Sequence, residues 1–256
     1  MGCTIAVIGG TGVYDPGILD GSEIVTVETP YGAATVSLGT FHGRRVAFMA
    51  RHGEGHSVPP HRVNYRANMA ALNKLGVERV LATAAVGSLN PVMAPGHLVA
   101  VDQFIDLTKS RPQTFFEGGQ AGVVHTDMTQ PYCPELRDLL RSAAGRLGLV
   151  LHHGGTYVCT EGPRFETPAE IKMIRMVGGD LVGMTGVPEV VLARELGMCY
   201  AAVAMVTNFA AGISPTRLSH QEVLEVMGEN AAKIRRLLME VIDGVDGTGG
   251  CPCRGA

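Results

Sequence analysis

Two apolar runs with almost no polar residue, Val80–Ala85 and Cys199–Thr207, constrain the fold of this chain more than any other feature. A strand with one face in water alternates apolar and polar residues, whereas a strand covered on both faces is apolar throughout. A third run, Thr4–Ile8, is apolar after its first residue and leads directly into a glycine-rich turn. All three runs are therefore predicted to be strands of a sheet that has helices on both faces.

Strands and helices alternate along the rest of the sequence. Residues 23–51 hold three β-rich runs separated by turn residues, which is typical of antiparallel hairpins. Further strands are predicted at Leu98–Val101, Phe104–Leu107 and Thr156–Thr160. Start and stop signals around helical periodicity predict helices at Val63–Leu75, Pro134–Leu147, Pro168–Val177 and Glu189–Leu196, and a last one that begins at Ser219. This order predicts an α/β fold, a three-layer sandwich with a mixed central β-sheet.

The length and composition predict one domain. A chain of 256 residues, 46% of them hydrophobic, can bury a sizeable core, and we expect a single domain over residues 1–243. Residues 244–256 are glycine-rich and are predicted to be a flexible tail in which Cys251 and Cys253 are either exposed thiols or a strained disulfide. The other cysteines are expected to be buried free thiols, and because no CxxC pairs occur, no metal site is predicted.

The charge and the apolar runs argue against several classes of partner. A net charge of −3 and a pI near 6.3 provide no basic field for a nucleic acid. The longest apolar runs are too short to cross a bilayer, and the first residues carry no basic leader. We therefore expect a cytoplasmic protein.

Two segments have the composition of an anion site. In Gly9–Gly12, successive backbone N–H groups and the Thr11 hydroxyl are suited to cradle an anion, although a plain tight turn has the same sequence. A dinucleotide fingerprint requires a third glycine and a helix, and Pro16 interrupts any helix here. Arg51 and His52 follow a predicted strand, and a guanidinium fork matches phosphate oxygens, although such a pair is more often a surface or supporting feature.

Two other segments suit a flat heterocycle. Phe165 and Glu166 lie between a strand and a capped helix, and an aromatic face beside a carboxylate fits a ring that carries an N–H donor. The alternative is that Glu166 only favours the positive end of the helix dipole, but Glu170 already supplies the capping carboxylate. Asn208 ends an apolar strand and offers a donor and an acceptor together, although it is also an ordinary turn residue.

Taken in order, the segments GGTG, ARHGEGH, PPHRVNYRAN, AAVGSL, YVCTEGPRFET, GMTGVPEVVLARELGM and VTNFAAG resemble the nucleoside phosphorylase family, which includes methylthioadenosine phosphorylase and trimeric purine nucleoside phosphorylase. The resemblance runs from about Ile5 to Leu238. Each motif alone is weak, but seven in the family's order make chance agreement very improbable. The resemblance implies an α/β fold, a homotrimer or a dimer of trimers, and no metal or organic cofactor, with inorganic phosphate as co-substrate.

The resemblance also assigns site residues. It implies that phosphate is held by Thr11, Arg51, His52, the backbone around Ala84 and Ala85, and Thr185. Methylthioadenosine enzymes usually have threonine where this chain has Ala84, which removes one hydroxyl contact. It further implies that Met184 packs against the ribose, that Phe165, Glu166 and Asn208 face the base, and that His125 is lent to the neighbouring subunit's pocket.

Substrate choice follows from hydrogen-bond polarity. Methylthioadenosine enzymes read the 6-amino group with a TDxD motif, whereas this chain has Asn208 and Ala210 there, together with Glu166. A 6-oxopurine presents an N1–H donor and an O6 acceptor, which suit a carboxylate and an amide. His220 occupies the position where 5′-hydroxyl enzymes of the family have histidine, so inosine and guanosine are expected as substrates before methylthioinosine.

The expected activity is therefore phosphorolysis of 6-oxopurine nucleosides to a free base and ribose 1-phosphate in purine salvage. The catalytic residues would be Arg51, His52 and Asn208. The alternatives are an S-methyl-5′-thioinosine phosphorylase and, after it, a methylthioadenosine phosphorylase or a non-catalytic nucleotide-binding module. A metal-dependent nucleoside hydrolase would require an acidic cluster, and the sequence shows none.

Overall fold

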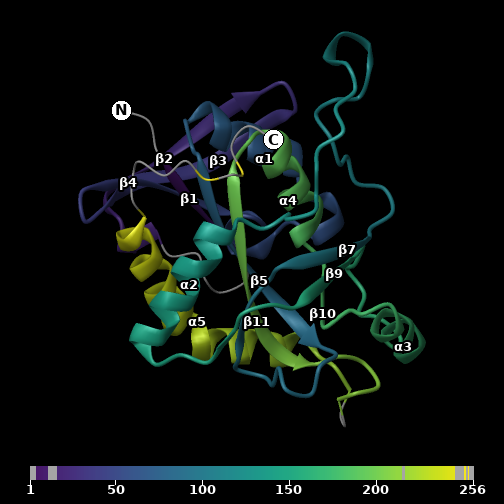
Figure 1. Cartoon of the computed structure of the whole chain (residues 1–256). Coiled ribbons are helices and arrows are strands. Elements are labelled where there is room, and N and C mark those ends of the chain that lie inside the picture. Colours follow the sequence, from purple (N-terminus) through teal and green to yellow (C-terminus); the bar gives the residue numbers. More distant parts are fainter. Residues whose placement is uncertain (1–3, 11–15, 215–216, 246–250, 252, 254–256) are drawn as a thin grey trace.

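The computed structural model describes residues 4–10, 16–214, 217–245, 251 and 253. Within this part of the chain, eleven strands form one mixed sheet that helices cover on both faces (Figure 1). Its strands are β1 (Ile5–Gly9), β2 (Asp20–Thr29), β3 (Gly32–Phe41), β4 (Arg44–Ala50), β5 (Arg79–Ser88), β6 (Leu98–Ala100), β7 (Gln103–Leu107), β8 (Leu151–His152), β9 (Thr156–Thr160), β10 (Leu181–Gly183) and β11 (Cys199–Phe209). The predicted α/β fold with a mixed sheet is confirmed.

Strand β5 organises the sheet. It pairs in parallel with β1 over its first residues and with β11 along its whole length, while β10 pairs antiparallel with its last two residues. The predicted hairpins are present, because β2, β3 and β4 pair antiparallel in sequence order before β4 joins β1 in parallel. The sheet therefore combines an antiparallel edge with a parallel centre.

Five α-helices lie within the described residues: α1 (Tyr65–Lys74), α2 (Pro134–Leu147), α3 (Pro168–Met176), α4 (Gly186–Glu195) and α5 (His220–Gly244). Their ends follow local chemistry. Helix α2 starts at Pro134 and stops at Gly148, which adopts the left-handed conformation with φ of 65°. Helix α3 starts with the predicted capping box, in which Thr167 and Glu170 exchange hydrogen bonds. Helix α5 is capped by the Ser219 hydroxyl.

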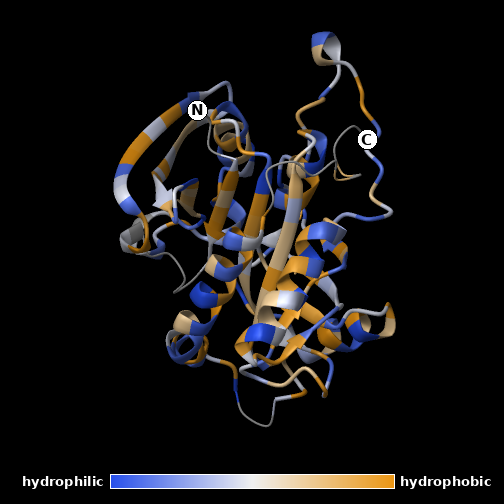
Figure 2. Ribbon diagram, turned by 60° about the vertical axis from the view of Figure 1, so that its left-hand side comes forward, coloured by the Kyte–Doolittle hydropathy of each residue, from blue (hydrophilic) through white to orange (hydrophobic). Residues whose placement is uncertain are grey.

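The core is divided by the sheet into two apolar layers, as alternation along β11 shows. Tyr200 and Ala202 face the layer that also contains α1 and α4, whereas Ala201 and Val203 face α2 and α5. A smaller cluster packs α3 against β9 and β10. In Figure 2 the central strands are mostly hydrophobic and the polar residues gather on the outer turns of the helices. None of the described helices is long and apolar enough to cross a membrane.

The C-terminal thiols differ from the prediction. Cys251 and Cys253 are each only 5% exposed and are free, so the expectation of exposed thiols or of a disulfide between them is wrong. Both pack into the apolar layer formed by α2 and α5. The prediction that Cys133, Cys159 and Cys199 are buried free thiols is confirmed.

Candidate active site

A cavity of about 420 Å³ opens where β1, β4, β9, β10 and β11 end. In open α/β sheets, ligands bind beyond the strand ends, where side chains from several strands converge. Among the assigned residues that the structure describes, all except His125 line the cavity, namely Arg51, His52, Ala84, Ala85, Phe165, Glu166, Met184, Thr185, Asn208, Ala210 and His220. Segments more than 150 residues apart along the chain therefore meet at one pocket.

Arg51, at the end of β4, is held by a buried carboxylate. Its Nε and one terminal nitrogen donate to the two carboxylate oxygens of Glu189, both at 2.7 Å, and its other terminal nitrogen donates to the carbonyl of Thr83 at 2.8 Å. Glu189 also accepts a hydrogen bond of 2.7 Å from the hydroxyl of Tyr200. This corrects the interpretation of the Arg51 guanidinium fork as a phosphate ligand, because the edge formed by Nε and one terminal nitrogen already binds Glu189 and is not open to phosphate.

The remaining edge of Arg51 stays available to an anion. A guanidinium has five N–H groups, and three are used by Glu189 and Thr83. Gly10 lies directly beside this group, since a Cβ added there would sit 3.3 Å from a terminal nitrogen of Arg51. The Gly10 amide is itself fixed, because it donates to the Thr83 hydroxyl at 2.9 Å. The end of β1 and the guanidinium thus form one fixed, electropositive end of the cavity.

Thr185 lies beside this end at the start of α4. The backbone N–H groups of Thr185 and Gly186 both donate to the hydroxyl of the buried Tyr157, at 3.0 and 3.1 Å. Gly183 and Gly186 lie two residues before and one residue after Thr185. Both contact the Tyr157 ring so closely that a Cβ added at either glycine would lie 2.8 Å or less from it. Tyr157 therefore sets the backbone that carries the Thr185 side chain.

His52 is neutral and has a defined tautomer. Its Nδ1 lies 2.8 Å from the carbonyl of Val58 and must donate to it, which leaves Nε2 as an acceptor. Burial, followed by the charge of Arg51, lowers the pKa of His52 to about 4. The ring packs against His56 at 4.2 Å between centroids, and His56 lies 5.9 Å from His220. Burial, together with His220, also lowers the pKa of His56.

The opposite end of the cavity carries Glu166. One of its carboxylate oxygens accepts a hydrogen bond of 2.6 Å from the hydroxyl of Thr160, the last residue of β9. This contact fixes the carboxylate and leaves its second oxygen to accept from a ligand. Phe165, which is 36% exposed, lies next to it on the cavity wall. Glu170 is occupied at the helix cap and by Arg164, so it does not compete for this role.

Asn208 is oriented by its neighbours at a β-bulge. The register of β11 against β5 shifts between Val206 and Asn208, which leaves Thr207 as the extra residue. The Thr207 hydroxyl lies 2.8 Å from the amide oxygen of Asn208, and the amide nitrogen donates to the carbonyl of Phe209 at 2.9 Å. Because an amide nitrogen carries two hydrogens, one N–H of the 3%-exposed Asn208 remains to donate to a ligand.

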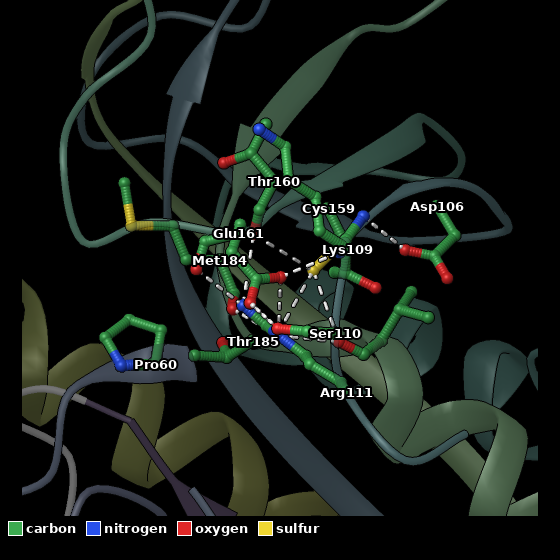
Figure 3. Close-up of polar contacts among 12 residues, drawn as sticks. Pro60, Asp106, Lys109, Ser110, Arg111, Cys159, Thr160, Glu161, Met184 and Thr185 are labelled. Carbon is green, nitrogen blue, oxygen red and sulfur yellow. Dashed lines mark hydrogen bonds and ion pairs between the residues drawn. The ribbon is translucent and has the colours of Figure 1, made fainter. Parts of the chain in front are cut away.

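Arg111, which the sequence analysis did not single out, joins the end of β9 to the segment that follows β10 (Figure 3). Its guanidinium is buried and donates to the carbonyls of Thr160, Glu161, Met184 and Val187, at 2.7 to 3.2 Å. These carbonyls belong to the end of β9 and to the segment after β10. Arg111 therefore fixes the distance between the backbone beside Glu166 and the backbone of Met184.

Two assigned residues stand apart. Thr11 lies outside the described residues. His125 is exposed and does not line the cavity of its own chain, so its assignment to a neighbouring subunit stays a prediction. The sequence analysis missed Glu189, Thr83, Tyr157 and Arg111, which support the site from behind. For Glu189 and Thr83 the only local signal is a charged or polar residue inside an apolar segment, as in the run GVPEVVLA, whereas Arg111 lies in a polar segment that gives no such signal.

Comparisons with known proteins agree with this geometry. Residues 4–243 match the Phosphorylase superfamily. The chain is 63% identical to the probable 6-oxopurine nucleoside phosphorylase of Moorella thermoacetica, over 97% of this chain and 96% of that protein, and 53% identical to the 6-oxopurine nucleoside phosphorylase of Pyrococcus furiosus, over 98% and 97%. A solved methylthioadenosine phosphorylase from an antarctic soil metagenomic library superposes with a TM-score of 0.91 at 37% identity, over 98% of this chain and 90% of that chain. This chain therefore belongs to the Phosphorylase superfamily.

Proposed function

We propose that this enzyme cleaves inosine and guanosine with inorganic phosphate, releasing hypoxanthine or guanine and ribose 1-phosphate. The observation that carries the proposal is the opposite polarity of two fixed groups that line the same cavity, the acceptor oxygen of Glu166 and the donor N–H of Asn208. Relatives at 53 to 63% identity are named 6-oxopurine nucleoside phosphorylases, which supports the same assignment.

The base end discriminates oxo from amino purines by hydrogen-bond pairing. A 6-oxopurine donates from N1–H to Glu166 and accepts at O6 or N7 from Asn208. Adenine has no hydrogen on N1, so its N1 lone pair would face the Glu166 carboxylate, and its 6-amino donor would replace the O6 acceptor that the Asn208 N–H can meet. A site built to pair with a substrate N–H rejects the analogue that lacks it by several orders of magnitude.

Phosphate binds at the other end, against the free edge of Arg51 and the Thr185 hydroxyl. His52 contributes as an acceptor, because its lone pair on Nε2 suits the hydroxyl of a monohydrogen phosphate or of the ribose. As the glycosidic bond lengthens, the sugar gains oxocarbenium character and the adjacent phosphate charge stabilises it. Asn208 stabilises the charge that develops on the departing purine. No covalent enzyme intermediate is required.

The sugar lies between these ends, beside Met184 on one side and the three imidazoles of His52, His56 and His220 on the other. A row of polar rings suits a 5′-hydroxyl, which gives and accepts hydrogen bonds, whereas a methylthio group gains little from them. Inosine is therefore proposed as a better substrate than methylthioinosine.

Assembly and location are also part of the proposal. The loop around Gly119–Ala121 extends away from the body of the subunit (Figure 1), and Val123 and Val124, which follow it next to His125, are 69% and 48% exposed. Exposed apolar side chains of this kind mark contact surfaces, which supports a trimer or a dimer of trimers in which His125 reaches a neighbouring pocket. The free thiols of the described cysteines are the state that a reducing compartment maintains, which supports a cytoplasmic location.

The test is base release by the purified full-length protein with and without phosphate. Inosine and guanosine should react only with phosphate present, and adenosine should have a kcat/KM lower on the order of 10²-fold or more. Glu166→Gln should reduce kcat/KM for inosine strongly, whereas the matched variant Glu170→Gln, which alters the α3 cap and the ion pair with Arg164, should keep the substrate profile. Faster turnover of adenosine or methylthioadenosine, or release that needs no phosphate, would overturn the proposal.

The sugar specificity is tested separately with His220→Ala. The variant should lose activity on inosine and lose much less on methylthioinosine. A preference of the wild type for methylthioinosine that persists in His220→Ala would contradict the role of this histidine.

A further inference from the structure

Four cysteine side chains meet in one buried cluster away from the active site. The sulfurs of Cys133, Cys199, Cys251 and Cys253 all lie within 4.8 Å of one another, and those of Cys133 and Cys251 are 3.3 Å apart. None of the four residues is more than 5% exposed. The cluster is therefore a closed set of four soft ligand atoms.

The cluster joins three parts of the chain. Cys133 is the N-cap of α2, and its N–H donates to the carbonyl of Tyr200 at 2.8 Å. Cys199 begins β11, and its N–H donates to the carbonyl of Glu78 at 2.9 Å. These two sulfurs are fixed by the core, whereas Cys251 and Cys253 arrive from beyond the end of α5. The spacing of one residue between the last two cysteines is not a typical zinc motif, so the cluster is not evident from the sequence.

The dimensions fit a tetrahedral metal. Four sulfurs at about 2.3 Å from a central zinc ion lie about 3.8 Å from one another. Closing the present arrangement around an ion requires each sulfur–sulfur distance, now at most 4.8 Å, to approach that value, a change of no more than about 1 Å. Thiolate sulfur is the ligand type that favours zinc, and a closed set of four cysteines is typical of structural sites. We propose that Cys133, Cys199, Cys251 and Cys253 bind one structural Zn²⁺ ion.

A buried cation, the guanidinium of Arg194, lies beside the cluster and would offset the negative charge of such a site. Zinc with four thiolates carries two negative charges, which are costly to bury without compensation. The guanidinium of Arg194, 6% exposed, donates to the carbonyl of Cys253 at 3.0 Å, and its Nε has no hydrogen-bond partner among the described residues. In that part of the chain it also forms no ion pair with a carboxylate.

The consequence is a staple between the C-terminal segment and the core. The ion would join residues 251–253 to the first turn of α2 and to the start of the central strand β11. Because metal binding to a folded site contributes directly to the free energy of folding, the site should matter for stability and not for the reaction. The active-site cavity shares no residue with the cluster.

The experiment is metal analysis of the full-length protein, expressed in zinc-supplemented medium and purified under reducing conditions without chelator. Mass-spectrometric metal analysis should find one zinc per subunit. Cys251→Ser/Cys253→Ser should retain less than a tenth of that amount, and its melting temperature should fall by at least about 4 °C. Cys159→Ser, which changes a buried cysteine outside the cluster, should keep the full amount of zinc.

Two further measurements keep the proposal falsifiable if the double variant fails to fold. Protein loaded with Co²⁺ in place of zinc should show the sulfur-to-metal charge-transfer and intense d–d absorption of a tetrahedral tetrathiolate. Arg194→Gln should weaken zinc retention against a chelator by about 10–100-fold. The proposal is overturned if the wild type contains no stoichiometric zinc, if iron replaces it, or if the unreduced mass is lower by the four hydrogens that two disulfides would remove.

Discussion

Replacing Glu189 with glutamine tests the buried ion pair behind the phosphate end of the cavity. Glu189 is fully buried and holds Arg51 through two hydrogen bonds of 2.7 Å, so Glu189→Gln keeps the shape and removes the charge. Breaking a buried pair by neutralising one partner leaves an uncompensated charge, at a cost of about 3–5 kcal/mol. For a chain of this length that corresponds to a fall in melting temperature of roughly 6–20 °C.

The assay combines thermal unfolding with phosphate titration. Without Glu189, the charge of Arg51 is compensated only when phosphate binds, so phosphate should raise the melting temperature of the variant more than that of the wild type. Glu195→Gln is the matched control, because Glu195 lies on the same helix and accepts from the Thr114 hydroxyl and the Phe115 N–H, which are neutral donors. The control should lose less than about 1.5 kcal/mol. A destabilisation of Glu189→Gln below that of the control, with an unchanged KM for phosphate, would refute the reasoning.

Four further predictions follow from the same geometry. The pKa of His52 is lower in the folded protein than in the unfolded chain, so the unfolded chain binds a proton at this ring first and the free energy of unfolding falls as the pH drops from 6.5 towards 4. Denaturant titration should show that the wild type loses about 2 kcal/mol more stability than His52→Gln between pH 7 and pH 5. Asn208→Ala should lower kcat for inosine on the order of 10²-fold in steady-state assays, and an unchanged kcat would remove its leaving-group role. Gly162→Ala should raise KM for the nucleoside, because φ is +64° there and the added Cβ would lie 2.6 Å from the sulfur of Met184; a wild-type KM would contradict this contact. Arg111→Lys should lower kcat/KM roughly 10-fold or more, since one ammonium cannot reach four carbonyls; equal kinetics would show that the clamp is dispensable.

The elements themselves were largely predictable from sequence, because their signals are local. The predicted bounds of α2 and β9 are those observed, since Pro134, Gly148 and the flanking polar turns act within a few residues. The two-residue β8 and three-residue β10 were missed, because strands this short carry no measurable periodicity. The ordered motifs likewise sufficed to gather most of the site, and this includes Met184 and Thr185, which follow the unpredicted strand β10.

Tertiary structure decided what depends on contacts between distant segments. Arg51 and Glu189 are 138 residues apart, so nothing near either one shows that half of the guanidinium is already occupied. The bulge at Thr207, which sets the orientation of Asn208, exists only in the register of β11 against β5. The four-sulfur cluster likewise arises from three segments with no shared spacing. Sequence alone determined which residues are buried in strands and which residues end those strands. Only the packed sheet determined which strand ends face one another, because the distance between two strand ends is set by strand register and not by any local preference.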